Sequence, residues 1–293
     1  MEHVESRAQH VLRRHPVRVT IVEPRRPGLR ATIRELWRYR RYTSFFGRQL
    51  LAKRYVRTWL GVAWLPLRPT LSVAAKLLVF GGLVGISSGK TAYPVFFLAA
   101  TAAWQLFAEA AFWSTRSLDV NRSTLRVVHV PRLVVIVSSI VPSLVDFAIH
   151  ICFALAAVAY YLLKAHIFYL HLTPRTPLYV LGGLGLISAL GVGIGLLTAG
   201  VGARARDVRF ALVYSLGFLY YLTPVIYPFS AIPDSYKPLA ELNPVTGAME
   251  LFKVGLFRGE FVSWKAVLVS VIAVFVLWVP GLWLFQRREV RDW

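Results

Sequence analysis

Residues 178–203 read LYVLGGLGLISALGVGIGLLTAGVGA, a run without a charged side chain. A helix that crosses the ~30 Å hydrocarbon layer of a bilayer needs about 20 mostly apolar residues, so this run predicts a membrane span. Five other segments have this character, or nearly so. The six predicted spans cover residues 70–88, 92–114, 133–163, 178–203, 208–229 and 264–285. We therefore expect an all-α integral membrane protein with six transmembrane helices, in a transmembrane domain over 70–286.

The composition of the 293 residues agrees with a membrane protein. Apolar residues make up 56% of the chain and charged residues 16%, whereas soluble domains carry about 25% charged residues. A single cysteine, Cys152, excludes a disulfide framework and a multi-cysteine metal site. The seven histidines are scattered, without the spacing of metal ligands. We expect no metal and no other cofactor in this chain.

The basic residues are divided unevenly between the two sides of the predicted spans. Of the 34 Lys and Arg residues, 26 fall on the side that holds both termini and 7 on the other side. Cytoplasmic loops carry such an excess, which predicts a basic cytoplasmic segment over 1–44 and a cytoplasmic tail over 287–293. Because the formal net charge of +20 follows membrane sidedness, we do not expect a nucleic-acid partner.

Residues 45–69 are predicted to form an amphipathic helix ahead of the first span. At 100° per residue its apolar residues share one face and its Lys and Arg residues another. Such a helix lies in the cytoplasmic interface among the lipid headgroups. Its role is either that of a plain anchor or that of an anchor that also captures the headgroup of a lipid-linked anionic substrate. The residues expected to capture a headgroup are Arg54, Arg57, Trp59, Trp64 and Arg68.

Three ionisable side chains fall inside predicted spans: Glu109, Asp146 and His150. Ionisable groups in a bilayer are costly and therefore point to a function. Asp146 and His150 are four residues apart, close enough on a helix to hydrogen-bond to each other. We expect a polar clamp within or between helices, and the alternative is a proton relay.

Aromatic residues recur along one side of two predicted spans, through the whole depth of the bilayer. Tyr and Trp rings stack on apolar groups while offering a hydroxyl or N–H, so these stripes can line a conduit for a sugar polymer. Simple helix packing is an equally serious alternative. The stripes consist of Tyr93, Phe97 and Trp104 in the second span and Phe210, Tyr214, Phe218 and Tyr221 in the fifth.

Residues 230–263 are too polar to span the membrane and too apolar for a free loop. Two short helices that dip into the membrane and return fit this pattern, with Pro244 breaking the run near its middle. Non-helical backbone at such depth must be shielded by protein or face water. We therefore expect re-entrant helices between spans five and six that form an outer gate.

A sequence that superficially resembles a phosphate-binding loop, GISSGKT at 85–91, has three residues between its glycines where the nucleotide-binding motif needs four. We expect no ATPase activity in this chain.

Four blocks give the sequence a resemblance to a known family. They read AKRYVRTWLGVAWLPLRP (52–69), VNRSTLRVVHVPRLVVIVSS (120–139), ARARDVRFALVYSLGFLYYLTPVIYP (203–228) and LNPVTGAMELFKVGLF (242–257). In order and character they resemble the membrane permease of type-2 ABC exporters for polysaccharides and polyol phosphates, the Wzm-like permeases of O-antigen, teichoic acid and capsule export. The resemblance covers residues 50–290.

The resemblance implies a homodimer with two copies of a separate ATPase, which binds ATP and Mg, in the bacterial inner membrane. The substrate would be a polyprenyl-linked polymer taken from the cytoplasmic leaflet. Coupling to the ATPase would fall to the loop 118–131 and to a second contact after span four. The coupling residues are Asn121, Arg122, Pro131, Arg132, Arg206, Asp207 and Arg209, and the outer-gate residues are Asn243, Pro244, Thr246 and Gly247.

Two other functions compete with this interpretation. A type-2 permease for drugs or small molecules has the same six spans, but it should lack the basic interfacial helix and the long aromatic stripes. An integral-membrane glycosyltransferase should have essential acidic residues near an outer active site and should work without an ATPase.

Overall fold

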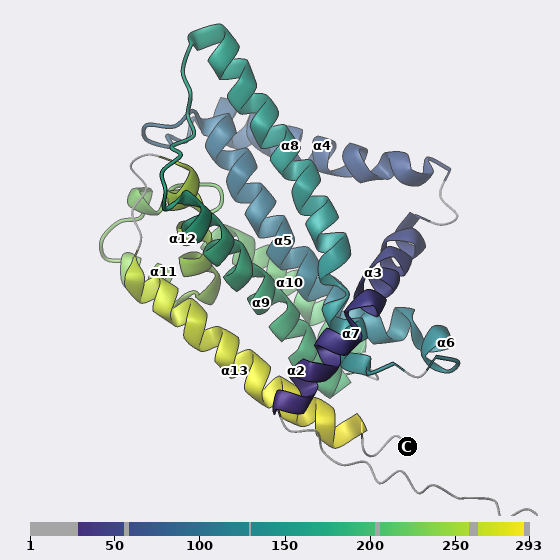
Figure 1. Cartoon of the computed structure of the whole chain (residues 1–293). Coiled ribbons are helices and arrows are strands. Elements are labelled where there is room, and N and C mark those ends of the chain that lie inside the picture. Colours follow the sequence, from purple (N-terminus) through teal and green to yellow (C-terminus); the bar gives the residue numbers. More distant parts are fainter. Residues whose placement is uncertain (1–28, 56–58, 129, 203–205, 258–262, 290–293) are drawn as a thin grey trace, which may run out of the picture.

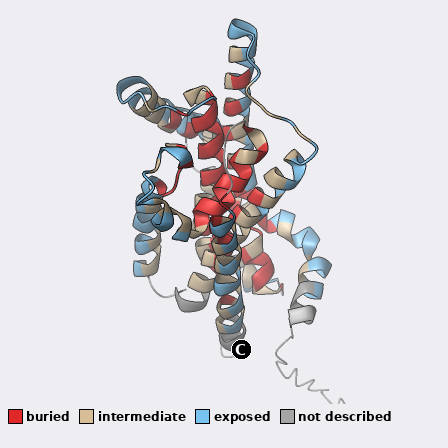
Figure 2. Cartoon of the chain, turned by 90° about the vertical axis from the view of Figure 1, so that its left-hand side faces the viewer, coloured by how far each residue is buried: buried red, intermediate tan, exposed pale blue. Residues whose placement is uncertain are grey.

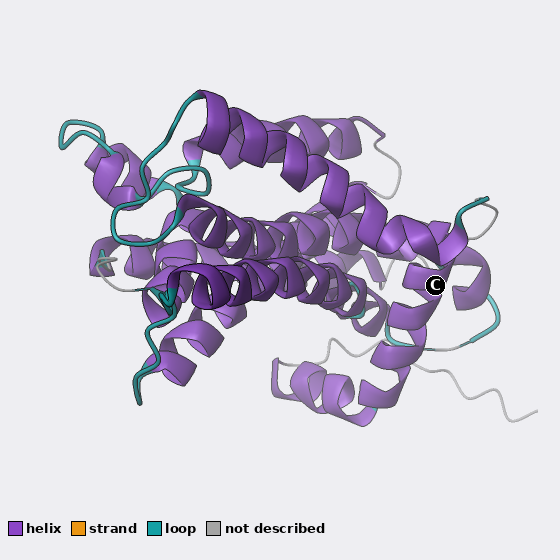
Figure 3. Cartoon of the chain, turned by 90° about the horizontal axis from the view of Figure 1, so that it is seen from above, coloured by secondary structure: helices purple, strands orange, loops and turns teal. Residues whose placement is uncertain are grey.

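The computed structural model describes residues 29–55, 59–128, 130–202, 206–257 and 263–289. In these residues the chain is helical, and the only β feature is an isolated bridge between Leu170 and Phe257. Figure 3 shows helices joined by loops throughout this part of the chain. The prediction of an all-α fold is confirmed.

The first half of the chain forms α2 (Leu29–Arg38), α3 (Arg40–Tyr55), a 3-10 turn (Gly61–Ala63), α4 (Trp64–Leu77), a π-helical turn (Leu78–Leu83), α5 (Tyr93–Val120), α6 (Arg122–Leu125), α7 (Arg132–Val137) and α8 (Ile140–Ala165). The second half forms α9 (Thr176–Gly202), α10 (Arg206–Leu222), a 3-10 turn (Phe229–Ala231), α11 (Lys237–Leu242), α12 (Pro244–Leu256) and α13 (Trp264–Glu289).

Helix α5 forms the centre of the bundle, between α8 and α9 (Figure 1). In its most apolar stretch of 18 residues, 78% is buried. Figure 2 shows buried residues gathered along the middle of the molecule. Small residues permit this packing. A Cβ added at Gly191 of α9 would lie 2.7 Å from the Cβ of Ala110, and one at Gly195 would overlap Ser114. The backbones of α5 and α9 are therefore in close contact.

Among the described residues, five helical segments are long and apolar enough to span a membrane, and each overlaps a predicted span. They are Gly61–Leu83, Tyr93–Val120, Arg132–Ala165, Thr176–Ala199 and Trp264–Leu284. The predicted helix over 208–229 is too long, because α10 ends at Leu222. The cause is Pro224, which has no N–H to continue the helix and disfavours helical backbone in the residue before it.

The predicted interfacial helix over 45–69 is also wrong in extent. Helix α3 ends at Tyr55, and residues 61–69 belong to the segment that contains α4. Gly61 has a φ of +51°, a left-handed conformation that glycine adopts without strain, and it turns the chain between the two parts. Pro66 lies in the first turn of α4, where no N–H is needed.

Helices α2 and α6 and the C-terminal end of α13 gather at one end of the bundle (Figure 1). Helix α11 and the first turn of α13 lie at the opposite end. The described parts nearest to the two termini are thus at the same end of the molecule.

Candidate functional site

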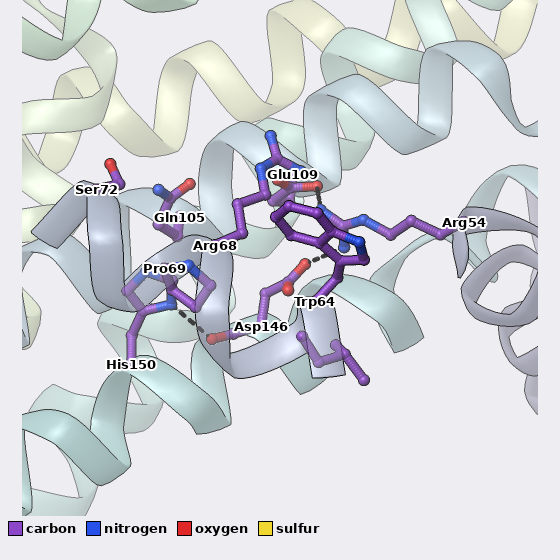
Figure 4. A pocket seen from close by; sticks show the side chains of 10 residues that line it. Arg54, Trp64, Arg68, Pro69, Ser72, Gln105, Glu109, Asp146 and His150 are labelled. Atoms are coloured by element: carbon purple, nitrogen blue, oxygen red, sulfur yellow. Dashed lines mark hydrogen bonds and ion pairs between the residues drawn. The ribbon is translucent and has the colours of Figure 1, made fainter. Parts of the chain in front are cut away.

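A polar pocket lies between the C-terminal end of α3, the first three turns of α4, and the middle of α5 and α8 (Figure 4). Its cavity measures about 100 Å³. The lining residues are Arg54, Trp64, Leu65, Arg68, Pro69, Ser72, Gln105, Glu109, Asp146 and His150. Glu109 is 11 residues before the end of α5, which at 1.5 Å per residue puts the pocket about 16 Å from that end.

Arg54 bridges two carboxylates inside this pocket. Its Nη2 is 3.0 Å from Oε2 of Glu109, and its Nη1 donates to Oδ2 of Asp146. The Glu109 carboxylate also accepts from Nε1 of Trp113 at 2.7 Å, and the guanidinium of Arg54 lies 5.4 Å from the centre of that ring. Because the three charged side chains are only 8–16% exposed, Arg54 clamps α3 to α5 and α8.

Asp146 and His150 do hydrogen-bond to each other, but through the backbone of Asp146 and not through its carboxylate. Nδ1 of His150 donates to the backbone oxygen of Asp146 at 2.8 Å, while the carboxylate of Asp146 faces Arg54. With Nδ1 as donor, the neutral imidazole presents Nε2 as an acceptor. That atom is buried and has no hydrogen-bond partner among the described residues.

The pocket brings together two sets of residues that the sequence presented separately. Arg54, Trp64 and Arg68 come from the predicted headgroup set, and Glu109, Asp146 and His150 are the three intramembrane polar residues. The guanidinium of Arg54 is bound to the carboxylates of Glu109 and Asp146, so the structure does not support Arg54 as a headgroup ligand. Trp64 and Arg68 are exposed. Trp59 is 98% exposed and outside the pocket, and Arg57 is outside the described residues.

Helix α3 also contacts the predicted coupling loop. Nε2 of Gln49 donates to Oγ1 of Thr124 at 3.0 Å. Nζ of Lys53 donates to the backbone oxygen of Val120 at 2.7 Å and to Oδ1 of Asn121 at 3.4 Å. Burial lowers the pKa of Lys53. The C-terminal half of α3 thus contacts both the predicted coupling loop, through Gln49 and Lys53, and the pocket, through Arg54.

The predicted coupling residues cluster at the end of the bundle that holds α6. Arg209 of α10 forms a salt bridge with Asp119, which joins the two predicted contact regions. Asn121 is buried and donates to the backbone oxygen of Ser117 at 2.9 Å, so its side chain is not on the surface of the chain. The other residues are placed as follows: Arg122 and Asp207 are exposed, Pro131 and Arg132 are half-buried at the start of α7, and the side chain of Arg206 is outside the described residues.

The two aromatic stripes have different environments. Phe97 and Trp104 are buried in the core of the protomer, and Tyr93 stacks on Phe97 with ring centres 5.7 Å apart. The stripe on α5 therefore packs against the rest of this chain. The stripe on α10, formed by Phe210, Tyr214, Phe218 and Tyr221, is between 57% and 76% exposed.

The segment between α10 and α13 contains two short helices, α11 and α12, as predicted. Asn243 caps α12: its Oδ1 accepts from the backbone N–H of Val245 at 3.0 Å, and its Nδ2 donates to Oγ1 of Thr223 at 2.9 Å. Pro244 occupies the first turn of α12, where no N–H is needed. Gly247 and Thr246 are buried.

The sequence reasoning missed a buried ion pair in α12. Nζ of Lys253 is 2.5 Å from Oε1 of Glu250, and both side chains are fully buried. Lys253 also donates to the backbone oxygen of Pro224 at 3.0 Å. The spacing of opposite charges three residues apart in an apolar run was the available signal.

Comparison with known proteins identifies the family. The profile of the ABC-2 type transporter family matches residues 42–257. The chain is 24% identical to the O-antigen export system permease protein RfbA of Myxococcus xanthus, over 88% of this chain and 96% of that protein. It is 22% identical to RfbA of Klebsiella pneumoniae, over 82% and 89% of the two chains. It is 24% identical to the polysialic acid transport protein KpsM of Escherichia coli, over 80% and 89%.

These matches confirm the resemblance that the four sequence blocks indicated. The family profile covers the pocket, the coupling loop, α10 and α12, which are the parts that carry the predicted functional residues. The chain belongs to the ABC-2 type transporter family, as a multi-pass membrane permease.

Proposed function

We propose that the chain is the permease subunit of an ATP-driven exporter that moves a lipid-linked polysaccharide, or a teichoic-acid-type polymer, from the cytoplasm across the bacterial inner membrane. The observation that carries this proposal is the similarity to relatives named for O-antigen export and polysialic acid transport, over 80% or more of this chain. Two copies of the chain work with two copies of an ABC ATPase, which holds ATP and Mg.

The exposed aromatic face of α10 supports a glycan as the substrate. Four aromatic side chains repeat along a helix that a protomer alone leaves uncovered. In the proposed homodimer this face lines the conduit, where the rings stack on the apolar faces of sugars and Tyr214 and Tyr221 offer hydroxyls.

Helix α10 supplies the sixth span in this proposal. Its 17 residues extend over about 26 Å at 1.5 Å per residue, and residues 223–229 complete the crossing. An even number of spans agrees with α2 and the end of α13 lying at the same end of the bundle. The excess of Lys and Arg on that side assigns it to the cytoplasm.

At that cytoplasmic end, the ATPase docks on the loop around α6 and the start of α10. Arg122 and Asp207 are exposed there, and the Arg209–Asp119 salt bridge keeps the two contact regions together. Motion of the loop reaches the pocket through Gln49, Lys53 and Arg54 of α3. ATP binding needs to favour one permease state by only a few kcal/mol to drive the change.

Substrate enters beside α4. The segment Gly61–Leu83, which contains α4, packs loosely on the bundle, since only 11% of its most apolar 18-residue stretch is buried. Trp64 and Arg68 receive the lipid-linked headgroup at the rim of the pocket. Helices α11 and α12 form the outer gate, where Asn243 connects the gate to the end of α10.

Depletion of the chain in its native host tests this function. We expect lipid-linked polymer to accumulate inside the cells while polymer on the surface declines, because synthesis continues without export. Normal surface polymer together with lost efflux of a small molecule would overturn the proposal in favour of a drug permease. Loss of polymer synthesis itself, with no internal accumulation, would overturn it in favour of a glycosyltransferase.

A further inference from the structure

An unpaired polar atom and two further polar side chains line the pocket between α3, α4, α5 and α8. Nε2 of His150 is buried without a hydrogen-bond partner among the described residues, and the His150 residue is 3% exposed. The side chains of Gln105 and Ser72, both half-buried, also line the cavity. Buried polar groups are nearly always paired, so the unpaired Nε2 of His150 indicates a polar occupant, and Gln105 and Ser72 add hydrogen-bonding groups beside it.

The charges of the pocket argue against phosphate as that occupant. Arg54 is bound to both Glu109 and Asp146, and Arg68 is the only other cation in the lining. Two guanidinium groups and two carboxylates give no net charge. An anion within the cavity would lie beside two carboxylates whose counter-charge is already engaged, which is unfavourable at low dielectric.

A ligand rich in hydroxyl groups matches the same residues. Hydroxyls both donate and accept, so they can donate to Nε2 of His150 and to the carboxylates and accept from the amide of Gln105. Trp64 provides an aromatic ring at the exposed edge of the cavity (Figure 4), and such a ring packs against the C–H face of a sugar. A cavity of about 100 Å³ corresponds to roughly three waters. It has room for the hydroxyl-bearing edge of one ring and not for a second sugar.

We propose that this pocket binds one uncharged sugar ring of the exported polymer, through Gln105, His150 and Ser72, on the cytoplasmic half of the path. The proposal rests on the proposed export function and adds a subsite for the glycan itself, separate from capture of the lipid-linked phosphate by Arg68. Since α3 connects Arg54 to the coupling loop, the occupied pocket is in direct contact with the element that senses the ATPase.

The test measures binding of monosaccharides to the full chain in lipid nanodiscs. Methyl glycosides of glucose, galactose, mannose and N-acetylglucosamine serve as probes, with saturation-transfer NMR as the readout. We expect saturable binding of at least one glycoside. We expect Gln105→Leu and His150→Phe each to weaken it about fivefold or more, the effect of one lost hydrogen bond. Inorganic phosphate should not displace the sugar.

Ser87→Ala is the control matched to Ser72→Ala, because Ser87 is exposed in the loop before α5 and does not line the pocket. It should leave sugar binding unchanged. Ser72→Ala is a smaller change that keeps the test valid if His150→Phe fails to fold, and it should weaken binding in the same direction.

Three results would overturn the proposal: no saturable binding of any of the four glycosides, displacement of the sugar by inorganic phosphate, or an equal effect of Ser72→Ala and Ser87→Ala. Its failure is distinguishable from failure of the export function. If depletion of the chain stalls polymer inside cells but the nanodiscs bind no glycoside, only the subsite is refuted. If depletion leaves surface polymer normal, the exporter is refuted whatever the pocket binds.

Discussion

Replacing Arg54 with glutamine should destabilise the protein through the two carboxylates that it now neutralises. Glu109 and Asp146 are 16% and 9% exposed, so neither can regain full hydration when the guanidinium is removed. Breaking a buried ion pair by removing one partner costs about 3–5 kcal/mol, because the remaining charge stays buried. We expect a loss in this range for Arg54→Gln.

The charge argument predicts how the loss can be reversed. In the triple variant Arg54→Met, Glu109→Gln, Asp146→Asn, no charge is left without a partner, and replacing a whole buried ion cluster by neutral groups is often tolerated. We expect this variant to recover most of the lost stability. The stability of Arg54→Lys should lie between those of Arg54→Gln and the unchanged protein. An ammonium keeps the charge but lacks the planar fork with which the guanidinium reaches both carboxylates.

Stability can be measured as the free energy of unfolding by SDS titration in mixed micelles, with Arg48→Gln as the control. Arg48 is exposed on the same helix, so its loss should change stability by no more than about 0.5 kcal/mol. Equal stability of Arg54→Gln and Arg48→Gln would refute the clamp. A triple variant less stable than Arg54→Gln would show that packing or hydrogen bonding dominates over charge.

Three further predictions address the gate, the conduit and the coupling surface. Gly247→Ala should lower the melting temperature in detergent, because a Cβ would lie 2.1 Å from the backbone oxygen of Ala266. Such overpacking costs about 1–3 kcal/mol of stability. An unchanged melting temperature would contradict this close approach. Tyr214→Ala should slow polymer export more than ATP hydrolysis in the reconstituted complex while stability stays within about 0.5 kcal/mol, and an equal loss of both activities would favour a packing role. Arg209→Asp should reduce co-purification with the ATPase, and adding Asp119→Arg should restore it. Both side chains are 30% exposed, so the stability of the chain should change by less than about 1 kcal/mol. A double variant that co-purifies no better than the single one would refute the link between the two contact regions.

The long helices could be predicted from hydropathy because membrane spans are defined by length and apolar character. The predicted span 178–203 corresponds to helix Thr176–Gly202, and the predicted span 264–285 corresponds to helix Trp264–Glu289. The errors in the predicted helix bounds occurred near prolines. Pro224 ends α10 before the end of the predicted span 208–229, and a first-turn proline such as Pro66 is compatible with the start of α4 inside the predicted interfacial segment.

The members of the pocket could be predicted more easily than their pairing. Arg54 and Glu109 stood out in the sequence for independent reasons, one on a basic interfacial helix and one inside a span. Periodicity tells which residues share a face of one helix, but not which helices pack together. Gln105 and Ser72 gave no signal, since a neutral polar residue in a span is unremarkable until a cavity is found beside it.

The Glu250–Lys253 pair shows how burial changes the meaning of a charge. In the sequence Lys253 counts as one more basic residue of an outer loop, yet its side chain is fully buried. It donates to the oxygen of Pro224, just after α10 ends, and the neighbouring Thr223 accepts from Asn243. Two adjacent residues thus hold the end of α10 to α12, and separating them would break a hydrogen bond of a buried cation. The C-terminal end of α10 is therefore tied to α12 by two hydrogen bonds, so a displacement of that end must either carry α12 with it or break these bonds.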